Sequence, residues 1–251
     1  MLRRLLSHTS AVGLAGSTSY TRRSSERAEE VLSLLKERVA LEGKVILDLG
    51  CGVAPLSESF QRISTFLVGL DVNERYVREA QRNTSLELVL GDAKRIPFKN
   101  DSFDFILCND VLEHVRDEAE LMREVLRVLA CNGAAYIQCA NRYQIIEPHF
   151  LLPFLSWIPR TLANIYVRIA GKGKNYEGYY PKTRRGILAL TKVHRTVDLT
   201  YERTYAKIES LNIRSKVLRQ VVSVARIILS DRYIAAVAQN FSIISILVFK
   251  D

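Results

Sequence analysis

The chain has 251 residues, of which 48% are hydrophobic and 25% are charged, and its formal net charge is +9. This length is enough for one α/β domain with a large core, and the composition is that of a globular protein rather than a disordered one. The charge is uneven, because residues 142–232 hold 17 Lys and Arg but only 6 Asp and Glu. Either this half has an anionic partner, such as a phosphorylated substrate, an acidic membrane surface or a nucleic acid, or it is a solvated basic surface.

Residues 1–25 contain four arginines and no acidic residue. That composition is similar to a mitochondrial transit peptide. The alternative, which we favour, is a flexible basic N-terminal arm on a cytoplasmic protein, with one domain over residues 26–251. The next segment, 27–41, has apolar residues at helical spacing and predicts an amphipathic helix.

A strand, a glycine turn and a helix are predicted over residues 44–58. Val45 to Leu47 is a short apolar run typical of a buried strand, and Asp48, Gly50 and Gly52 follow at alternate positions. Pro55 suits a first helical position, and we expect that helix over about 55–63. Such a turn lets the backbone approach a ligand closely, and its N–H groups can hold a polar or anionic group.

Three further strands are predicted over residues 68–71, 88–90 and 103–108. Each ends in polar residues: Asp71, Gly91-Asp92-Ala93 and Asn109-Asp110. Asp71 lies 19 residues beyond Gly52, which is near the spacing of a ribose-binding carboxylate in a nucleotide-binding fold. Polar residues thus recur where open α/β sheets bind ligands, at the carboxyl ends of successive strands.

The rest of the chain continues the alternation of helix and strand. A helix should reach Leu129, stop at an Asn132-Gly133 turn and lead into a fifth strand over 134–140. We then predict a helix over 200–211, a strand over 213–218, a helical stretch over 221–238 with a break near Ser230, and a closing strand over 242–249. A helix at about 74–82 links the second and third strands.

Four motifs resemble those of the class I S-adenosylmethionine-dependent methyltransferases, in the branch that includes ubiquinone and menaquinone methyltransferases: ILDLGCG, GLDVN, GDAKRIPFKNDSFDFILCNDVLEHV and RVLACNGAAYIQ. They occur in the family's order over about residues 40–142. Ala54 departs from the family pattern, which usually has a third glycine there. Because alanine is small, we expect little loss from this departure.

This resemblance implies an α/β fold: a doubly wound, Rossmann-like, seven-stranded and mostly parallel sheet with an antiparallel last strand, plus a lid insertion after the fifth strand. It implies S-adenosyl-L-methionine as cofactor. Asp48, Gly50, Gly52 and Asn109 are expected around the methionine end, and Asp71 with its neighbour Val72 at the ribose. Asp92 is expected at the adenine amino group, with the backbone of Ala93 beside it.

The insertion, about residues 143–199, should cover the substrate. Its first part, 141–160, is strongly apolar and contains the chain's only tryptophan, Trp157. The run is broken by proline and too short for a transmembrane helix. Three interpretations stay open: a lid over a hydrophobic substrate, an interfacial membrane contact with flanking basic residues, or plain packing or a dimer face.

A methyl acceptor that is a hydroxyl or a carbon acid needs a base. His149, between Glu147 and the apolar run, is our first candidate, and His114 beside Glu113 is the second. Tyr143 and Glu147 are expected to orient His149 or the substrate. His8 and His194 have no supporting context.

We therefore predict methyl transfer to a small-molecule or lipid- or glycan-linked acceptor with an apolar portion. One alternative is an RNA methyltransferase, which the basic half favours but which lacks the expected Asn/Asp-Pro-Pro element after the fourth strand. Another is a cofactor-binding assembly factor without turnover, and a third is a NAD-binding Rossmann protein, disfavoured by the turn sequence. The four cysteines form no C-x-x-C pair, so we expect buried free thiols and no metal site.

Overall fold

The structure is a computed structural model, and it describes residues 18–209 and 216–250. The strands are β1 (Val45–Leu49), β2 (Phe66–Asp71), β3 (Glu87–Leu90), β4 (Phe103–Asn109), β5 (Leu129–Cys139), β6 (Ile146–Glu147), β7 (Leu152–Pro153), β8 (Arg195–Asp198) and β9 (Ile244–Phe249). The α-helices are α1 (Thr18–Leu35), α2 (Ser57–Gln61), α3 (Glu74–Asn83), α4 (Glu118–Val128), α5 (Arg160–Ile169), α6 (Arg184–Leu190), α7 (Thr200–Glu209), α8 (Lys216–Ala225) and α9 (Asp231–Ala238).

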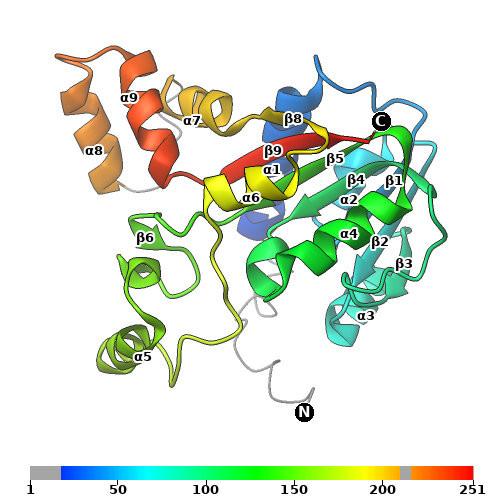
Figure 1. The fold of residues 1–251 in the computed structure, drawn as a ribbon, viewed down its shortest axis with the longest axis horizontal. Coiled ribbons are helices and arrows are strands. Elements are labelled where there is room, and N and C mark those ends of the chain that lie inside the picture. Colours follow the sequence, from blue (N-terminus) through cyan, green and yellow to red (C-terminus); the bar gives the residue numbers. More distant parts are fainter. Residues whose placement is uncertain (1–17, 210–215, 251) are drawn as a thin grey trace. The chain divides into compact units, whose positions relative to one another are not determined.

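The described strands form a seven-stranded sheet in the order β3-β2-β1-β4-β5-β9-β8 (Figure 1). The β1 strand is central, and it pairs in parallel with β2 on one side and with β4 on the other. Its residues Ile46, Leu47 and Leu49 are fully buried, which explains the continuous apolar run in the sequence. The fold is the doubly wound, mostly parallel sheet that the sequence predicts.

The last strand, β9, runs antiparallel to β5, as expected (Figure 1). The two strands meet at a bulge, where Asn132 N donates to Lys250 O at 2.9 Å and Lys250 N donates to Gly133 O at 3.0 Å. Two β5 residues thus face Lys250, the residue after β9, and Asn132 takes the left-handed conformation with φ +61°.

The helix stop predicted at Asn132-Gly133 was wrong, because these two residues form the bulge. The α4 helix ends at Val128, and β5 begins at once with the extended residue Leu129. Asparagine tolerates a positive φ inside a strand, so a dipeptide that normally ends a helix bends a strand here.

Two other predicted boundaries were also wrong. The first helix was expected at 27–41, but α1 spans Thr18–Leu35, so part of the expected arm is helical. The strand expected at 213–218 lies partly outside the described residues, and the rest of it begins α8 at Lys216. Residues 1–17, and with them His8, also lie outside the description.

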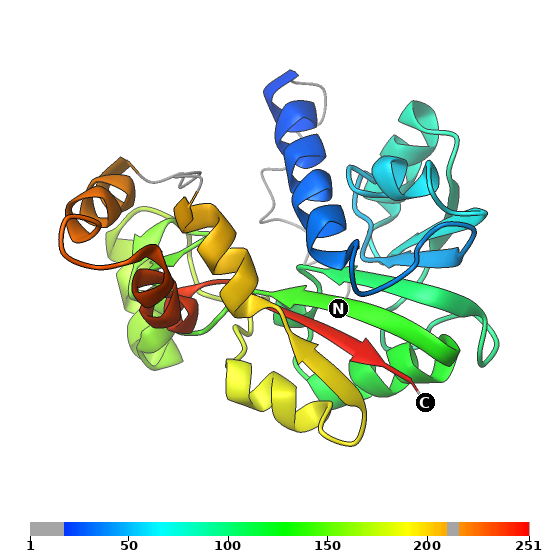
Figure 2. The ribbon, with the colours of Figure 1, turned by 90° about the horizontal axis from the view of Figure 1, so that it is seen from above.

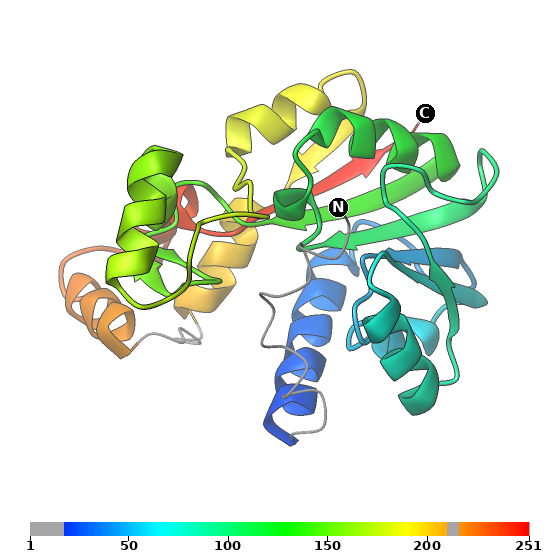
Figure 3. The same cartoon turned by 90° about the horizontal axis from the view of Figure 1, so that it is seen from below.

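The chain folds as two compact units. Of the described residues, the first contains 18–111, 117–137 and 248–250. In it, α1 and α4 cover opposite faces of the strands, as Figures 2 and 3 show from above and below. Side-chain caps start two of its helices, because Asn73 accepts from Arg75 N and Asp117 accepts from Glu120 N.

The second unit contains the described residues 112–116, 138–209 and 216–247. The β6–β7 hairpin and α5 enclose a small core that includes Leu155, Val167, Tyr176 and Tyr179. A second small core joins α7, α8 and α9 through Ile208, Val222 and Ala235. The expectation of one domain with an insertion over 143–199 stays a prediction.

Candidate functional site

The first unit gathers acidic and amide side chains at the carboxyl ends of its parallel strands. Strand order reverses around β1, since β2 and β3 lie on one side and β4 and β5 on the other. In open α/β sheets, ligands bind at such a switch point, outside the carboxyl ends of the strands. Every residue that the resemblance implies for cofactor binding lies in this unit.

Asp48 is the buried acid at the end of β1, with 3% of its surface exposed. Ser57 Oγ, at the start of α2, donates a hydrogen bond to Asp48 Oδ2 at 2.5 Å. Burial raises the pKa of the Asp48 carboxyl from 3.8 to about 7, the Ser57 hydrogen bond lowers it, and the charge of Asp71 raises it. Ser57 was not singled out from the sequence, because only the fold brings it to Asp48.

The turn after Asp48 has three left-handed residues at alternate positions: Gly50 at φ +75°, Gly52 at +57° and Ala54 at +62°. A Cβ at Gly50 would stand 2.3 Å from Val111 Cγ2, so glycine is required by packing as well as by φ. A Cβ at Gly52 would meet no atom within 4 Å, so the backbone there faces open space. A ligand can approach this glycine closely.

Ala54 was expected to matter little because it is small. The structure places it fully buried and left-handed, a conformation that costs an L-residue about 1–2 kcal/mol. The turn therefore carries local strain that a third glycine would not have.

Asp71 ends β2 and holds the turn in place. Its Oδ2 accepts from Gly52 N at 2.9 Å, and its Oδ1 accepts from Asn73 N at 2.7 Å. An ionised carboxylate has about four lone-pair sites, which is more than these two hydrogen bonds use. Val72 follows Asp71 in the chain, and 62% of its surface is exposed.

Asp92 and Ala93 form the turn after β3, as the sequence predicts. Asp92 Oδ1 accepts from Lys94 N at 2.9 Å, and Asp92 O accepts from Arg95 N at 2.9 Å. The Asp92 side chain is otherwise exposed. This turn presents an acceptor and backbone groups at the same sheet edge as Asp71.

Asn109 ends β4, and its Oδ1 is buried without a hydrogen-bond partner. An unpaired buried amide oxygen is unfavourable unless a ligand or water completes it. The neighbouring Asp110 forms an ion pair with Arg27 of α1, which fixes this helix at the end of β4. Arg27 was not singled out from the sequence, where it is one of many arginines.

These donors and acceptors fit S-adenosylmethionine. Carboxylates at Asp48 and Asp71 suit an ammonium group and ribose hydroxyls, the orphaned Asn109 oxygen needs a donor, and Gly52 leaves room for close approach. Burial raises the pKa of the Cys51 thiol, with Asp48 and Asp71 adding to the effect. Cys51 therefore stays a neutral packing residue in the turn, and like Cys108 and Cys139 it is buried, as expected. Cys131 was also expected to be buried, which was wrong: it is exposed next to the exposed bulge residue Asn132.

The second unit holds the predicted base candidates. His149 Nδ1 lies 3.1 Å from Glu147 Oε1, and the Glu147 side chain is fully buried. Glu147 Oε2 accepts from Phe150 N at 2.6 Å, so the carboxylate is fixed by the backbone of its own hairpin. A carboxylate that fixes one imidazole nitrogen directs the other nitrogen outward.

His114 joins the same cluster, with its ring centroid 5.2 Å from that of His149. Its Nδ1 lies 3.1 Å from Gly178 O. The ring of Tyr179 lies 4.2 Å from His149 and 5.9 Å from His114. Tyr179 was not singled out from the sequence, so sequence reasoning missed its place among the histidines.

Tyr143 lies in a different set of aromatic residues. Its ring packs edge-on against Trp157 at 6.0 Å, and Trp157 also stacks on Phe241 and contacts Phe154. Trp157 Nε1 donates to Gln144 O at 2.9 Å. The structure thus groups Glu147, His149 and His114, but it places Tyr143 with this separate aromatic set around Trp157.

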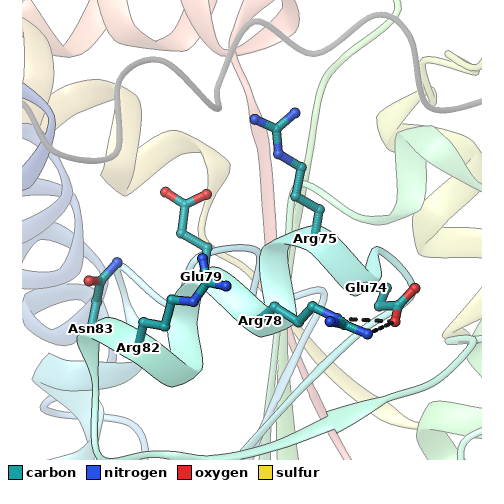
Figure 4. A pocket seen from close by; sticks show the side chains of 6 residues that line it. All are labelled: Glu74, Arg75, Arg78, Glu79, Arg82 and Asn83. Carbon is teal, nitrogen blue, oxygen red and sulfur yellow. Dashed lines mark hydrogen bonds and ion pairs between the residues drawn. The ribbon is translucent and has the colours of Figure 1, made fainter.

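Figure 4 shows a hollow on the outer face of α3, lined by six of its own residues. Arg78 forms an ion pair with Glu74 there, whereas Arg75 points away from that pair (Figure 4). No predicted site residue lines this hollow. It is a charged, solvated helix face rather than a ligand site.

Comparison with known proteins agrees with this geometry. Residues 47–137 match a family model described as a methyltransferase domain. A ubiquinone biosynthesis O-methyltransferase of Hahella chejuensis is 33% identical over 136 residues, which are 49% of this chain and 57% of that protein. A mitochondrial protein of the same name from Schizosaccharomyces pombe is 27% identical over 47% of this chain and 46% of its own length. The chain thus spans about half the length of these curated relatives.

Solved structures share the fold. An S-adenosylmethionine-dependent methyltransferase from Mesorhizobium loti is 18% identical and has a TM-score of 0.60 over 90% of this chain and 100% of its own. The YcgJ protein from Bacillus subtilis is also 18% identical, with a TM-score of 0.54 over 90% of this chain and 98% of its own. At this identity the likeness concerns the fold alone.

Proposed function

We propose that the chain is a class I S-adenosylmethionine-dependent methyltransferase and that it methylates a hydroxyl of a small-molecule or lipid-linked acceptor with an apolar portion. The observation that supports the proposal most directly is the row of acceptor groups at the ends of β1, β2 and β4. Asp48, Asp71 and the orphaned Asn109 oxygen form that row.

Each of these groups has a part in holding the cofactor. Asp71 accepts from the ribose hydroxyls, while its bonds to Gly52 N and Asn73 N keep the carboxylate in place. Asp48 would hold the methionine ammonium group, directly or through water, and Asn109 Oδ1 would accept from the same moiety. Asp92 and Ala93 would hold the adenine end, and Val72 would lie at the ribose with Asp71.

The bound cofactor supplies a methyl group on a positively charged sulfur, so its departure needs no general acid. The protein has to hold the acceptor oxygen in line with that methyl group and to remove the acceptor's proton. A neutral leaving thioether explains why no strongly acidic donor is required of the chain.

His149 is the proposed general base. Glu147 fixes its Nδ1, so Nε2 is the nitrogen that takes the acceptor's proton, and the buried carboxylate stabilises the resulting imidazolium. His114 and Tyr179 border the His149 ring and limit its rotation. The neighbouring apolar side chains Leu151, Phe154 and Trp157 suit the apolar portion of the acceptor.

The relatives named ubiquinone biosynthesis O-methyltransferases support a ring hydroxyl on a molecule with an apolar tail. We therefore expect quinone precursors to be better acceptors than sugars linked to a polyprenyl chain. An RNA acceptor has less support, because the basic residues of the second unit can serve any anionic partner.

The test is an acceptor screen with labelled S-adenosylmethionine, using catechol-type quinone precursors with short and long tails, polyprenyl-linked sugars and bulk RNA. We expect label in the quinone precursors, rising with tail length. His149→Ala should lower kcat about 10²- to 10⁴-fold, whereas His194→Ala, a histidine of the same unit outside the cluster, should leave kcat unchanged. Label in RNA alone, or cofactor binding without any turnover, would contradict the proposal.

A further inference from the structure

The two helices α8 and α9 form a hairpin with many large hydrophobic side chains exposed to solvent. Among its described residues only Val222 and Ala235 are buried. Seven large hydrophobic side chains face solvent instead: Val221, Val224, Ile227, Ile228, Leu229, Tyr233 and Val237. A surface helix normally turns such residues inward, so this outward face needs a partner.

The most exposed of these residues sit at the tip of the hairpin. Ile227 and Ile228 expose 81% and 85% of their surface, and Leu229 follows them. The tip joins α8 to α9, which run antiparallel in Figure 1. Three consecutive aliphatic residues at an exposed turn are unusual, because turns normally carry polar residues and glycine.

The turn is a built structure rather than a loose end. Ile228 N and Leu229 N both donate to Ala225 O, and Ser230 caps α9 by accepting from Tyr233 N. Arg226 binds Asp231 through two nitrogens and also donates to Ile208 O at 2.8 Å, which fixes the hairpin on α7. The aliphatic side chains are therefore held outward by a fixed backbone.

The charge of the hairpin is basic. Residues 216–238 contain Lys216, Arg219, Arg226 and Arg232, and Asp231 is their only acid. Residues 216–238 therefore carry a net charge of +3, and Asp231 is paired with Arg226 within the hairpin. Apolar residues at a tip with cations flanking them are the pattern of a segment that lies in a membrane interface.

We propose that the α8–α9 hairpin docks on an anionic phospholipid bilayer, with Ile227, Ile228 and Leu229 inserted below the headgroups and the cations at the lipid phosphates. None of the described helices is long and apolar enough to span a bilayer, and α8 and α9 have only 10 and 8 residues. The contact is therefore interfacial. A symmetric dimer through this face fits less well, because it would set the same cations against each other.

This inference does not depend on the proposed methyl transfer, and its test needs no turnover. The purified full chain is floated with phosphatidylcholine vesicles that contain or lack phosphatidylglycerol, at low and high salt. We expect flotation with the anionic vesicles, and we expect high salt to weaken it.

Two matched substitutions locate the contact. Ile228→Asp should lower vesicle partition at least about tenfold, since it replaces an inserted aliphatic group with a charge. Val193→Asp makes the same kind of change at a position that is 74% exposed, in the turn after α6, and should leave partition unchanged. Circular dichroism checks that both variants are folded.

Three outcomes would overturn the proposal. The first is wild-type protein that floats with neither vesicle, and the second is equal loss of partition in both variants. The third is a dimer in sedimentation equilibrium that Ile228→Asp dissociates, without any vesicle binding by the wild type. That result would assign the hairpin to a second copy of the chain.

Discussion

Asp48→Asn tests the electrostatics of the site without any ligand. In the unfolded chain this carboxyl ionises at about 3.8, whereas burial in the folded protein raises its pKa to about 7. Between these values the unfolded state binds fewer protons, so the free energy of unfolding falls as the pH rises. The full stability is present below pH 3.8 and is lost as the pH rises through 7.

At about 1.36 kcal/mol per pH unit, the whole loss is about 4 kcal/mol, and about 3 kcal/mol of it falls between pH 5 and pH 8. Asparagine has the same shape and stays neutral, so the variant should not show this loss. Ser57→Ala should show a larger loss than wild type, because the hydroxyl lowers the pKa of Asp48.

The assay is urea unfolding followed by circular dichroism at several pH values, with the cofactor absent. We expect Asp48→Asn to be the more stable protein at pH 8, by a margin that shrinks toward pH 5. Parallel stability curves for wild type and Asp48→Asn would refute the reasoning, since they would mean that Asp48 ionises alike in the folded and unfolded states.

Three further predictions concern binding and catalysis. Affinity for S-adenosylhomocysteine, measured by calorimetry, should increase about tenfold for each unit that the pH rises toward 7, because the ligand's ammonium favours ionised Asp48. Above pH 7 the affinity should level off, and an affinity that does not change with pH would argue against that contact. Gly50→Ala should cost about 3 kcal/mol or more in stability through its clash with Val111. Gly52→Ala should cost only about 1–2 kcal/mol yet abolish cofactor binding. If the two variants had equal effects on stability and on cofactor binding, that would contradict the open approach at Gly52. Glu147→Gln should lower kcat while KM changes little, because Glu147 holds the His149 ring. An unchanged kcat would remove Glu147 from the proton transfer.

Much of the first unit was predictable from the sequence. The runs ending in Asp48, Asp71 and Asn109 are short, apolar and followed by polar residues, so both the strands and their ligand-binding ends were recognisable. Here local pattern and tertiary environment agree, because a parallel strand buried on both faces has to be apolar along its whole length.

The misses have physical reasons. Asn132-Gly133 has the chemistry of a helix stop, but pairing with Lys250, which lies far away in the sequence, makes it a strand bulge. Ser57 and Tyr179 reach Asp48 and His149 only through the fold. The start of α8 was missed because periodicity alone cannot assign a short apolar run to a helix or a strand, so residues 213–218 were predicted as a strand.

The central claim is that the ends of β1, β2 and β4 hold S-adenosylmethionine, and calorimetric titration with S-adenosylhomocysteine tests it most directly. Wild type should bind. Asp71→Ala should bind at least about tenfold more weakly, because the two hydrogen bonds from the ribose hydroxyls to the charged Asp71 carboxylate are lost. Asp117→Ala removes an aspartate that only caps α4, so it should lose about 1 kcal/mol of stability and no affinity. Absence of binding to the wild type, or equal affinity of wild type and a folded Asp71→Ala, would contradict the account.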